Sequence, residues 1–491
     1  MSAPESISSA SSQSPSHTAA NPELFDVVIL GGGTGSTVAA WTFAGEGQRV
    51  AVVDRKYIGG SCPNIACLPS KNVIHSSKVA DYVRHSEEYG ISRGPMAIDM
   101  RVVRERKRKM VTSLNNVYLD TYEKTGAEFI LASGRFVAPL TVEATLAGGT
   151  RRYLRGTHVI VSTGTHAALE KIPGLAESEP LTHVEALELD HVPEHLVVIG
   201  GGYVGVELAQ AMRRFGSKVT LVERNEQLVY REDEDVTQGL RELFRDEGIE
   251  IVMDAHIRSV SGKSGERVKL ALEQKGAEKT VEGSDLLVAA GRIPNTEGLG
   301  LDVAGVALTD RGYIKVNDRL QTTAPGVWAI GEVAGSPQFT HISIDDFRVV
   351  HANINGGNRV TTGRQVPFCL FTDPEFARIG LSEKEARTQG VAYRLFKIPM
   401  EGVLRARTLG ETRGFLKALV DLESDRILGF TALGVDGGET MSVVQVAMLA
   451  GLPYTALRDA VIAHPTLAEG LEALFGSQPT TQNERSRTAN Q

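Results

Sequence analysis

Residues 25–36 read FDVVILGGGTGS, a short apolar run that leads directly into a glycine-rich turn. Such a run is typical of a buried parallel strand. A helix-compatible stretch follows to about Gly45, and a second strand from Arg49 to Val53 ends at Asp54. The order of strand, glycine turn, helix, strand and acid predicts a dinucleotide-binding unit, in which the turn approaches a pyrophosphate and the acid binds a ribose.

The same pattern occurs a second time in the chain. His195 to Ile199 forms the strand, GGGYVG at 200–205 the turn, and Val219 to Val222 the strand that precedes Glu223. In both copies the acid lies 23 residues after the first glycine. One glycine-rich turn occurs often by chance, but two copies at matched spacing predict two bound dinucleotides, FAD and NAD(P), with electron transfer between them.

The two copies supply most of the predicted cofactor-binding residues. They are Gly31, Gly33, Thr34, Gly35, Ser36 and Asp54 in the first, and Gly200, Gly202, Tyr203, Val204, Gly205, Glu223 and Arg224 in the second. Ser36 replaces the third glycine but is small enough for close helix–strand packing. Because Glu223 would repel a 2′-phosphate, NADH is favoured, although the adjacent Arg224 leaves NADPH open.

Two of the chain's three cysteines lie close together, as Cys62 and Cys67 in the segment GGSCPNIACLPSK, residues 59–71. Five residues of helix span roughly 7.5 Å, too far for a disulfide, so Cys62 is expected in a loop that folds back towards Cys67. In the first turn of a helix, Cys67 would have a stabilised thiolate. Two buried, inert thiols are the alternative reading.

This segment resembles the active-site loop of the flavin-dependent disulfide reductases, the family of dihydrolipoamide dehydrogenase, glutathione reductase and mercuric reductase. The resemblance covers about residues 24–475, with Pro63 and Ala66 departing from the usual loop residues. It implies an α/β fold with two Rossmann-like domains, for FAD and NAD(P), and a C-terminal α+β dimerisation domain. The implied boundaries are 24–165 with 292–365 for FAD, 166–291 for NAD(P) and 366–475 for the dimerisation domain.

The resemblance also implies roles for individual residues. Electrons would pass from NAD(P)H through FAD to Cys67, and Cys62 would exchange with the substrate. Lys71 would pair with Glu207 beside the flavin, and Tyr203 would cover the flavin until the nicotinamide displaces it. Further cofactor-binding residues by resemblance are Gly60, Ser61, Thr163, Gly164, Gly291, Gly331 and Glu332, where Glu332 replaces the usual aspartate. The helix expected from about Ser343 would direct its N-terminus at the flavin.

Near the C-terminus, the segment AHPTLAE at 463–469 resembles the family's acid–base motif. His464 would serve the Cys62 thiol and Glu469 would orient the imidazole. In the family this pair reaches the disulfide of the second subunit, which implies a homodimer with shared active sites. Cys369 is expected to be a buried small residue, and His341 has no assigned role.

Composition limits the remaining possibilities. The 491 residues are 42% hydrophobic and 23% charged, with a net charge of −8, which argues against nucleic acid as the main partner. No stretch approaches the ~20 apolar residues of a membrane span. The paucity of cysteines indicates a cytoplasmic protein, and no metal site is predicted.

Residues 1–23 and 476–491 are expected to be a disordered leader and tail. The basic stretch Arg101 to Lys109 is interpreted as the solvated face of a helix that buries Val102, Val103 and Met110.

The substrate is the least determined feature. Residues 336–339 (SPQF) and 412–417 (TRGFLK) look most like mercuric reductase, but the tail lacks the cysteine pair that delivers the metal ion there. Reduction of a small disulfide, or the reverse oxidation of dihydrolipoamide, is therefore expected. A mercuric-reductase-like enzyme acting on thiol oxidants or under metal stress is the first alternative. A non-catalytic flavin-binding redox sensor is the second.

Overall fold

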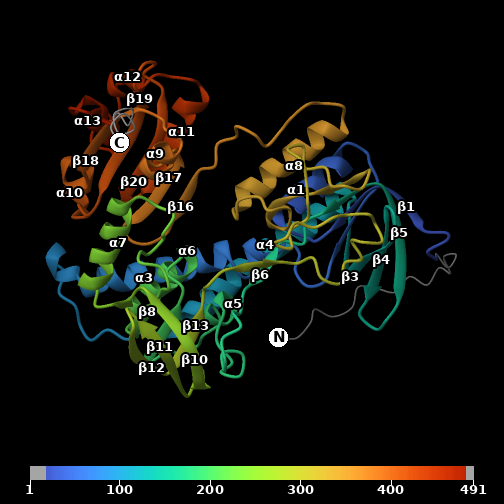
Figure 1. The fold of residues 1–491 in the computed structure, drawn as a ribbon, viewed down its shortest axis with the longest axis horizontal. Coiled ribbons are helices and arrows are strands. Elements are labelled where there is room, and N and C mark those ends of the chain that lie inside the picture. The colour runs from blue at the N-terminus through green and yellow to red at the C-terminus, as the bar shows by residue number, and fades with distance from the viewer. Residues whose placement is uncertain (1–17, 483–491) are drawn as a thin grey trace, which may run out of the picture. The chain divides into compact units, whose positions relative to one another are not determined.

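The computed structural model describes residues 18–482 (Figure 1). Contacts divide the chain into two compact units. The first contains the residues up to Gly60, Val117–Gly164 and Pro294–Thr361, and the second contains Ser61–Asn116, Thr165–Ile293 and the residues from Thr362 onward. The predicted α/β fold class is confirmed. The predicted leader lies mostly outside the described residues.

The first unit is built on a mainly parallel sheet. Its strands are β1 (Glu23–Leu30), β2 (Val50–Asp54), β3 (Glu128–Ala138), β4 (Thr141–Leu146), β5 (Arg151–Val161) and β15 (Val327–Ala329). Strand β1 pairs in parallel with β2 and β5, β2 pairs with β3, and β5 pairs with β15. Strand β4 runs antiparallel to both β3 and β5. Strand β1 is buried from Val27 to Leu30 and β2 from Val50 to Val53, as expected for strands covered on both faces.

Two helices lie side by side against this sheet, α1 (Thr34–Gly45) and α8 (Thr340–Ile354) (Figure 1). Their backbones approach so closely that a Cβ added to Gly35 would lie 2.3 Å from Ser343 Oγ. Phe43 and Phe347 meet edge to face between them. Helix α8 begins at Thr340, three residues before the predicted start.

The second unit contains another parallel sheet and a three-stranded antiparallel one. The parallel sheet has the order β13 (Asp285–Val288), β7 (His195–Ile199), β8 (Lys218–Val222), β9 (Glu250–Val252). The antiparallel strands are β10 (Ala255–Lys263), β11 (Arg267–Gln274) and β12 (Ala277–Gly283). Helices α6 (Tyr203–Phe215) and α7 (Glu234–Asp246) pack on the parallel strands.

The C-terminal part of this unit is an antiparallel sheet carrying helices α11 (Gly437–Leu449) and α13 (Gly470–Gly476). The strand order is β16 (Phe368–Leu370), β17 (Glu375–Gly380), β20 (Ile427–Gly434), β19 (Phe415–Asp421), β18 (Tyr393–Pro399), β21 (Thr480–Gln482). Strand β21 falls within the predicted disordered tail, and for its three residues the structure differs from that prediction. They pair with Tyr393–Leu395, an edge that the sequence does not reveal. Residues 483–491 lie outside the described part.

The remaining elements range from short turns of helix to the two long helices α3 and α4. They are α2 (Ser61–Asn64), α3 (Cys67–Arg84), η1 (Ser86–Tyr89), α4 (Met100–Thr125), β6 (Thr165–Ala167), α5 (His183–Ala186), β14 (Arg292–Pro294), η2 (Gly331–Ala334), α9 (Glu383–Thr388), η3 (Met400–Gly402), α10 (Leu404–Leu409) and α12 (Tyr454–Arg458). Within residues 18–482, no helix combines the length and apolar character that crossing a membrane requires.

Helix α4 corrects the interpretation of the basic stretch. Val102 is 64% exposed, whereas Lys107 is only 2% exposed. The Lys107 ammonium donates to Leu187 O at 2.8 Å and pairs with the Glu188 carboxylate. Burial lowers the pKa of Lys107 although Glu188 opposes that effect. The prediction failed because helical periodicity alone does not reveal a carboxylate that receives a buried lysine.

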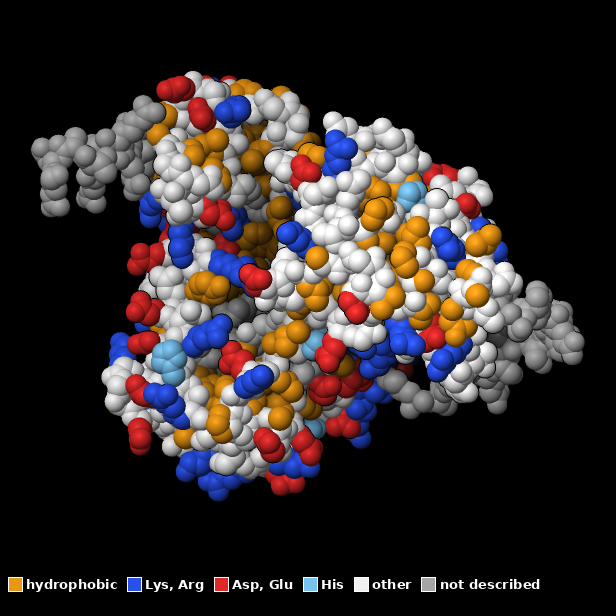
Figure 2. Space-filling view, turned by 45° about the vertical axis from the view of Figure 1, so that its right-hand side comes forward, with side chains coloured by type: hydrophobic (Ala, Val, Ile, Leu, Met, Phe, Trp, Pro, Cys, Tyr) orange, Lys and Arg blue, Asp and Glu red, His pale blue; other side chains and the backbone are white. Residues whose placement is uncertain are grey.

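The surface carries both signs of charge. On the face drawn in Figure 2, Lys and Arg side chains lie interspersed with Asp and Glu side chains. This mixture agrees with the modest net charge of −8.

Candidate functional site

The first glycine turn fits a dinucleotide phosphate. Gly31 has φ +97°, and a Cβ there would lie 2.3 Å from Ser162 O, so only glycine is tolerated. Helix α1 begins after Gly33 with no side-chain cap and no acid in its first turn. The hydroxyls of Thr34 and Ser36 are buried without a hydrogen-bond partner in the described residues. Uncapped amides and unused hydroxyls at a helix N-terminus suit an anion.

The second turn repeats this geometry. Gly200 has φ +108°, and an added Cβ would lie 2.5 Å from Ala289 O. At Gly205 an added Cβ would come within 1.9 Å of Gly200 O, which explains the glycine at this third position. Helix α6 also starts without a side-chain cap or a first-turn acid. At both predicted turns, the helix therefore begins with amide groups that no side chain caps.

The acid that ends each second strand binds the middle glycine of its own turn. Asp54 Oδ2 accepts from the Gly32 amide at 2.6 Å, and Glu223 Oε2 accepts from the Gly201 amide at 2.5 Å. The other Glu223 oxygen accepts from the Asn225 amide at 2.8 Å. Each carboxylate thus holds the turn in shape, in addition to the ribose contact predicted for it.

The two cysteines lie in consecutive helices. Cys62 is in the short helix α2, not in a loop as predicted. Ala66, with φ −129° and ψ −106°, leaves the helical region and separates α2 from α3, whose first residue is Cys67. No continuous helix therefore joins the two cysteines, and Cys67 has the predicted helix-start position. Both side chains are half-buried. Immediately before α2, a Cβ added to Gly60 would lie 2.5 Å from Gly33 Cα, so Ser61 follows a close backbone approach to the first turn.

Lys71 and Glu207 come together as predicted. Lys71 lies one helical turn after Cys67, and its Nζ is 2.7 Å from Glu207 Oε2. The Glu207 side chain is 7% exposed, and its Oε1 accepts from the Phe371 amide at 2.8 Å. The lysine also lies 4.8 Å from the centre of the Phe371 ring. A charged pair is thereby fixed at the start of the cysteine helix α3.

Two further polar residues, Asn295 and Asp346, support predicted cofactor residues but were not themselves predicted from the sequence. Asn295 holds the turn at Thr163 and Gly164: its amide donates to Gly164 O at 2.9 Å, and its side chain donates to Thr163 O at 2.8 Å. Asp346, fully buried on α8, accepts from the Gly331 amide at 2.7 Å. In the sequence, Asp346 could have been recognised as an acidic residue on the buried face of a helix.

The remaining predicted cofactor residues lie at turns and helix starts. Gly291 has φ +146° and accepts from the Ala168 amide at 2.9 Å. Glu332 lies half-buried in η2, directly after Gly331. Val204 and Arg224 are exposed beside the second turn.

His464 and Glu469 also form the predicted pair. The imidazole Nδ1 lies 2.9 and 3.1 Å from the two carboxylate oxygens of Glu469. The imidazole is 63% exposed in the single chain, so its second nitrogen is accessible. Cys369 is half-buried in β16, where burial and the nearby Glu375 raise the pKa of its thiol. A thiol held in its protonated form is inert, in agreement with the role expected for Cys369.

Helix α11 is apolar on two opposite faces. Val444 and Ala447 are buried against the sheet. On the other side, Val446 is 64% exposed and Leu449 67% exposed in the single chain. Exposed apolar side chains that lie together on a surface often mark a protein–protein contact.

Two dinucleotide turns, a cysteine pair at a helix start and a paired lysine define a redox enzyme of the two-nucleotide flavoprotein class. Residues 25–346 match the family described as "Pyridine nucleotide-disulphide oxidoreductase", and residues 366–475 match its dimerisation domain. The chain belongs to the pyridine nucleotide-disulphide oxidoreductase family.

Relatives span nearly the whole chain. The probable pyridine nucleotide-disulfide oxidoreductase RclA of Escherichia coli (strain K12) is 34% identical over 458 residues, covering 92% of this chain and 98% of that protein. A mercuric reductase of Staphylococcus aureus is 30% identical over 450 residues, covering 91% and 81%. A solved Cu(II) complex of the HOCl-induced flavoprotein disulfide reductase RclA from Escherichia coli superposes with a TM-score of 0.82 at 33% identity, covering 92% and 99%.

Membership in the family confirms several predictions. The protein is an FAD-dependent oxidoreductase that passes electrons from NAD(P)H through FAD to a disulfide. It is a homodimer.

Proposed function

We propose that Cys62 and Cys67 are the redox-active pair and that the protein reduces a small disulfide. FAD, when bound, supplies the two-electron transfer between NAD(P)H and this pair. In the dithiol form, Cys62 attacks one sulfur of the substrate, which forms a mixed disulfide and releases the first product thiol. Cys67 then attacks Cys62, which releases the second thiol and re-forms the Cys62–Cys67 disulfide.

One observation carries this proposal: Cys67 opens the 18-residue helix α3, with Lys71 one turn later held in place by Glu207. The helix N-terminus and the lysine both favour a thiolate at this end of the helix. Such an environment activates a cysteine, whereas two inert thiols would have no need of it.

We assign acid–base catalysis to His464. Glu469 binds Nδ1 and thereby directs Nε2 outwards, the orientation needed to exchange a proton with a thiol. As in the family, the pair serves the cysteines of the second subunit. The two glycine turns, with the residues predicted for each, hold FAD in the first copy and the nicotinamide cofactor in the second.

Anaerobic titration with NADH, followed by the visible spectrum, tests the proposal. We expect a long-wavelength band from charge transfer between a cysteine thiolate and the flavin, absent in Cys67→Ser and unchanged in the control Cys369→Ser. If the flavin is bleached without such a band in the wild type, the cysteine pair does not take the electrons and the proposal fails.

We further propose that NADH is the preferred reductant. The buried carboxylate of Glu223 disfavours a 2′-phosphate, and Arg224 is engaged by Glu170 Oε1 at 3.0 Å. Both side chains of this pair are solvent-accessible, so the pair is weak.

Releasing Arg224 is expected to improve the use of NADPH. In Glu170→Ala, the guanidinium can bind a 2′-phosphate, and kcat/KM for NADPH should rise about threefold while that for NADH is unchanged. Steady-state kinetics with both nucleotides measure the effect, and Glu179→Ala, which removes the partner of Lys263 in the same unit, is the control. An equal change for NADH and NADPH would contradict the role given to Arg224.

A second candidate function is reduction under oxidant or metal stress. It is favoured by the 34% identity to RclA, whose solved form is described as HOCl-induced and in complex with Cu(II). Anaerobic NADH oxidation with glutathione disulfide, lipoamide or Cu(II) as sole acceptor separates the two candidates. If Cu(II) is the only one of these acceptors that supports turnover, the protein acts under oxidant or metal stress and does not reduce a small disulfide. We also propose a cytoplasmic location, since a dithiol relay requires a reducing compartment.

A further inference from the structure

The chain directly after β16 is bound at three points by helix α6. The Phe371 amide donates to Glu207 Oε1 at 2.8 Å. Gln210 makes two hydrogen bonds to the backbone of Asp373: its Nε2 donates to Asp373 O and its Oε1 accepts from the Asp373 amide, each at 2.9 Å. Arg214 Nη1 lies 2.6 Å from Asp373 Oδ2. The spacing of 207, 210 and 214 places all three side chains on one face of the helix.

Helix α3 packs on α6 and contacts the same stretch of chain at two points. Lys71 Nζ lies 4.8 Å from the centre of the Phe371 ring. Two helical turns later, Lys78 Nζ lies 3.0 Å from Asp373 Oδ1. The two carboxylate oxygens of Asp373 therefore pair with cations from two different helices, Arg214 on α6 and Lys78 on α3. All these residues belong to the second unit.

The pairing of Asp373 takes place away from water. The Arg214 side chain is 7% exposed and that of Asp373 is 19% exposed. Burial alone would raise the pKa of Asp373, but Arg214 and Lys78 hold it below its usual value. Asp373 is therefore charged in the folded protein. Ion pairs and charge-assisted hydrogen bonds are stronger where water is excluded, so Asp373 fixes the two helices relative to each other.

We propose that Asp373 is a positioning residue for the cysteine pair, because it holds α3 and α6 so that Glu207 meets Lys71 one turn after Cys67. The C-terminal sheet, to which β16 belongs, thereby shapes the start of the cysteine helix in its own subunit. If the two helices are held less firmly, Lys71 is less well placed to stabilise a Cys67 thiolate. The inference rests on the redox role proposed for Cys67. Asp373 itself acts only through Glu207 and Lys71.

A pH titration of the charge-transfer band in the two-electron-reduced holoenzyme tests this inference, because the band reports ionisation of the Cys67 thiol. Asp373→Asn keeps the volume and the backbone hydrogen bonds to Gln210 but removes the charge. A less stabilised thiolate has a higher pKa, so the pH at which half of the band is lost should rise by roughly 0.5–1 unit, a three- to tenfold change in ionisation. In a Glu207→Gln background the same substitution should cause no further rise, since the pair with Lys71 is already lost.

Asp246→Asn is the matched control. Asp246 Oδ2 lies 2.8 Å from Arg413, and both side chains are 43% exposed. The control thus also breaks an ion pair between α7 and the C-terminal part of the chain, but it should leave the titration unchanged. Lys78→Met removes only the contact from α3. It should shift the titration in the same direction, and it replaces Asp373→Asn if thermal unfolding shows that this variant is not folded.

Two results would overturn the role of Asp373 alone. One is an unshifted titration in the folded variant. The other is an equal shift in the Glu207→Gln background, which would show that the effect does not pass through Glu207. A wild type that shows no band at all would instead overturn the proposed cysteine relay, and this inference with it.

Discussion

Lysine at both Val446 and Leu449 is expected to convert the dimer into a monomer that has lost disulfide reduction. The two side chains are 64% and 67% exposed in the single chain, so the change leaves the core of each subunit intact. Lysines near the C-terminus of α11 are compatible with the helix dipole. We infer that this face of α11 contacts the second subunit, where the lysines would place uncompensated charges in an apolar contact, which is costly.

The two activities of the protein should respond differently. On the proposed assignment, His464 serves the cysteines of the second subunit and has no access to them in a monomer. General acid–base catalysis typically contributes 10²–10⁴-fold. We therefore expect disulfide turnover to fall by roughly 100-fold or more. Reduction of an artificial dye by NADH should continue, because both glycine turns belong to one chain.

Sedimentation velocity and the two activity assays measure this prediction together. Leu131→Lys is the control, since Leu131 is 58% exposed on β3 of the first unit, outside the dimerisation domain. Two results would contradict the prediction: a variant that remains dimeric, or a monomer with full disulfide turnover.

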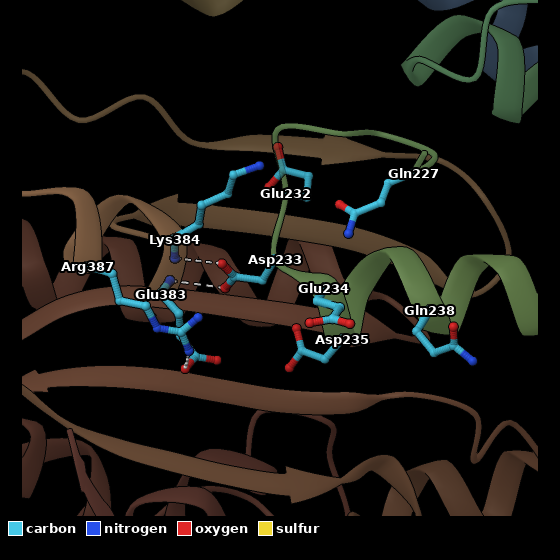
Figure 3. Close-up of a pocket in the computed structure, with 9 residues that line it drawn as sticks. All are labelled: Gln227, Glu232, Asp233, Glu234, Asp235, Gln238, Glu383, Lys384 and Arg387. Carbon is cyan, nitrogen blue, oxygen red and sulfur yellow. Dashed lines mark hydrogen bonds and ion pairs between the residues drawn. The ribbon is translucent and has the colours of Figure 1, made fainter. Parts of the chain in front are cut away.

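Replacement of Lys417 by methionine is expected to cause the largest loss of stability. The Lys417 side chain is 0% exposed, and its Nζ lies 2.8 Å from Asp233, 2.8 Å from Asp235 and 3.0 Å from Glu383. Figure 3 shows these three acids at the starts of α7 and α9. Methionine fills a similar volume but leaves three carboxylates without their shared cation.

Breaking a buried ion pair costs about 3–5 kcal/mol, because the remaining charge stays desolvated. The corresponding fall in Tm is roughly 5–8 °C for a unit of this size, measurable by scanning calorimetry. The stabilisation that the Lys417 ion pairs contribute in the wild type should also depend on pH. Burial alone would raise the pKa of Asp233, but Lys417 holds it below its usual value. The folded state therefore keeps this stabilisation above the usual Asp range and loses it as the pH falls through the lowered pKa.

Lys397 provides a matched control on the same acid. Its Nζ is 2.6 Å from Asp235, but its side chain is 40% exposed, so Lys397→Met should cost about 0–1 kcal/mol. The three carboxylates each offer an oxygen within 4.8 Å of the others, a spacing able to hold a metal ion. Millimolar Ca²⁺ should therefore raise the Tm of Lys417→Met but not that of the wild type. Equal Tm values for the two lysine variants would refute the role given to Lys417.

Most of the fold was predictable from local sequence. The strands and helix starts at both glycine turns lie within a few residues of the predicted positions, because glycine turns and apolar strands are properties of short segments. The pairs Lys71–Glu207 and His464–Glu469 were found through the family resemblance, since their members lie in recognisable motifs.

Other features depend on packing between distant segments. The hydrogen bond from Tyr203 to Glu232 and the ion pair of Glu232 with Arg378 join a helix start, a loop and a strand. Lys417 likewise contacts acids from two separate helix starts. In the sequence, Glu232 and Asp233 are two acids within an acidic run, indistinguishable from a solvated surface. A charged side chain is desolvated only when tertiary packing encloses it. Tertiary packing therefore decides whether an acid stays on the surface or pairs with a buried cation. Helix α11 follows the same reasoning, because packing against its own sheet decides which of its apolar residues are buried in the subunit.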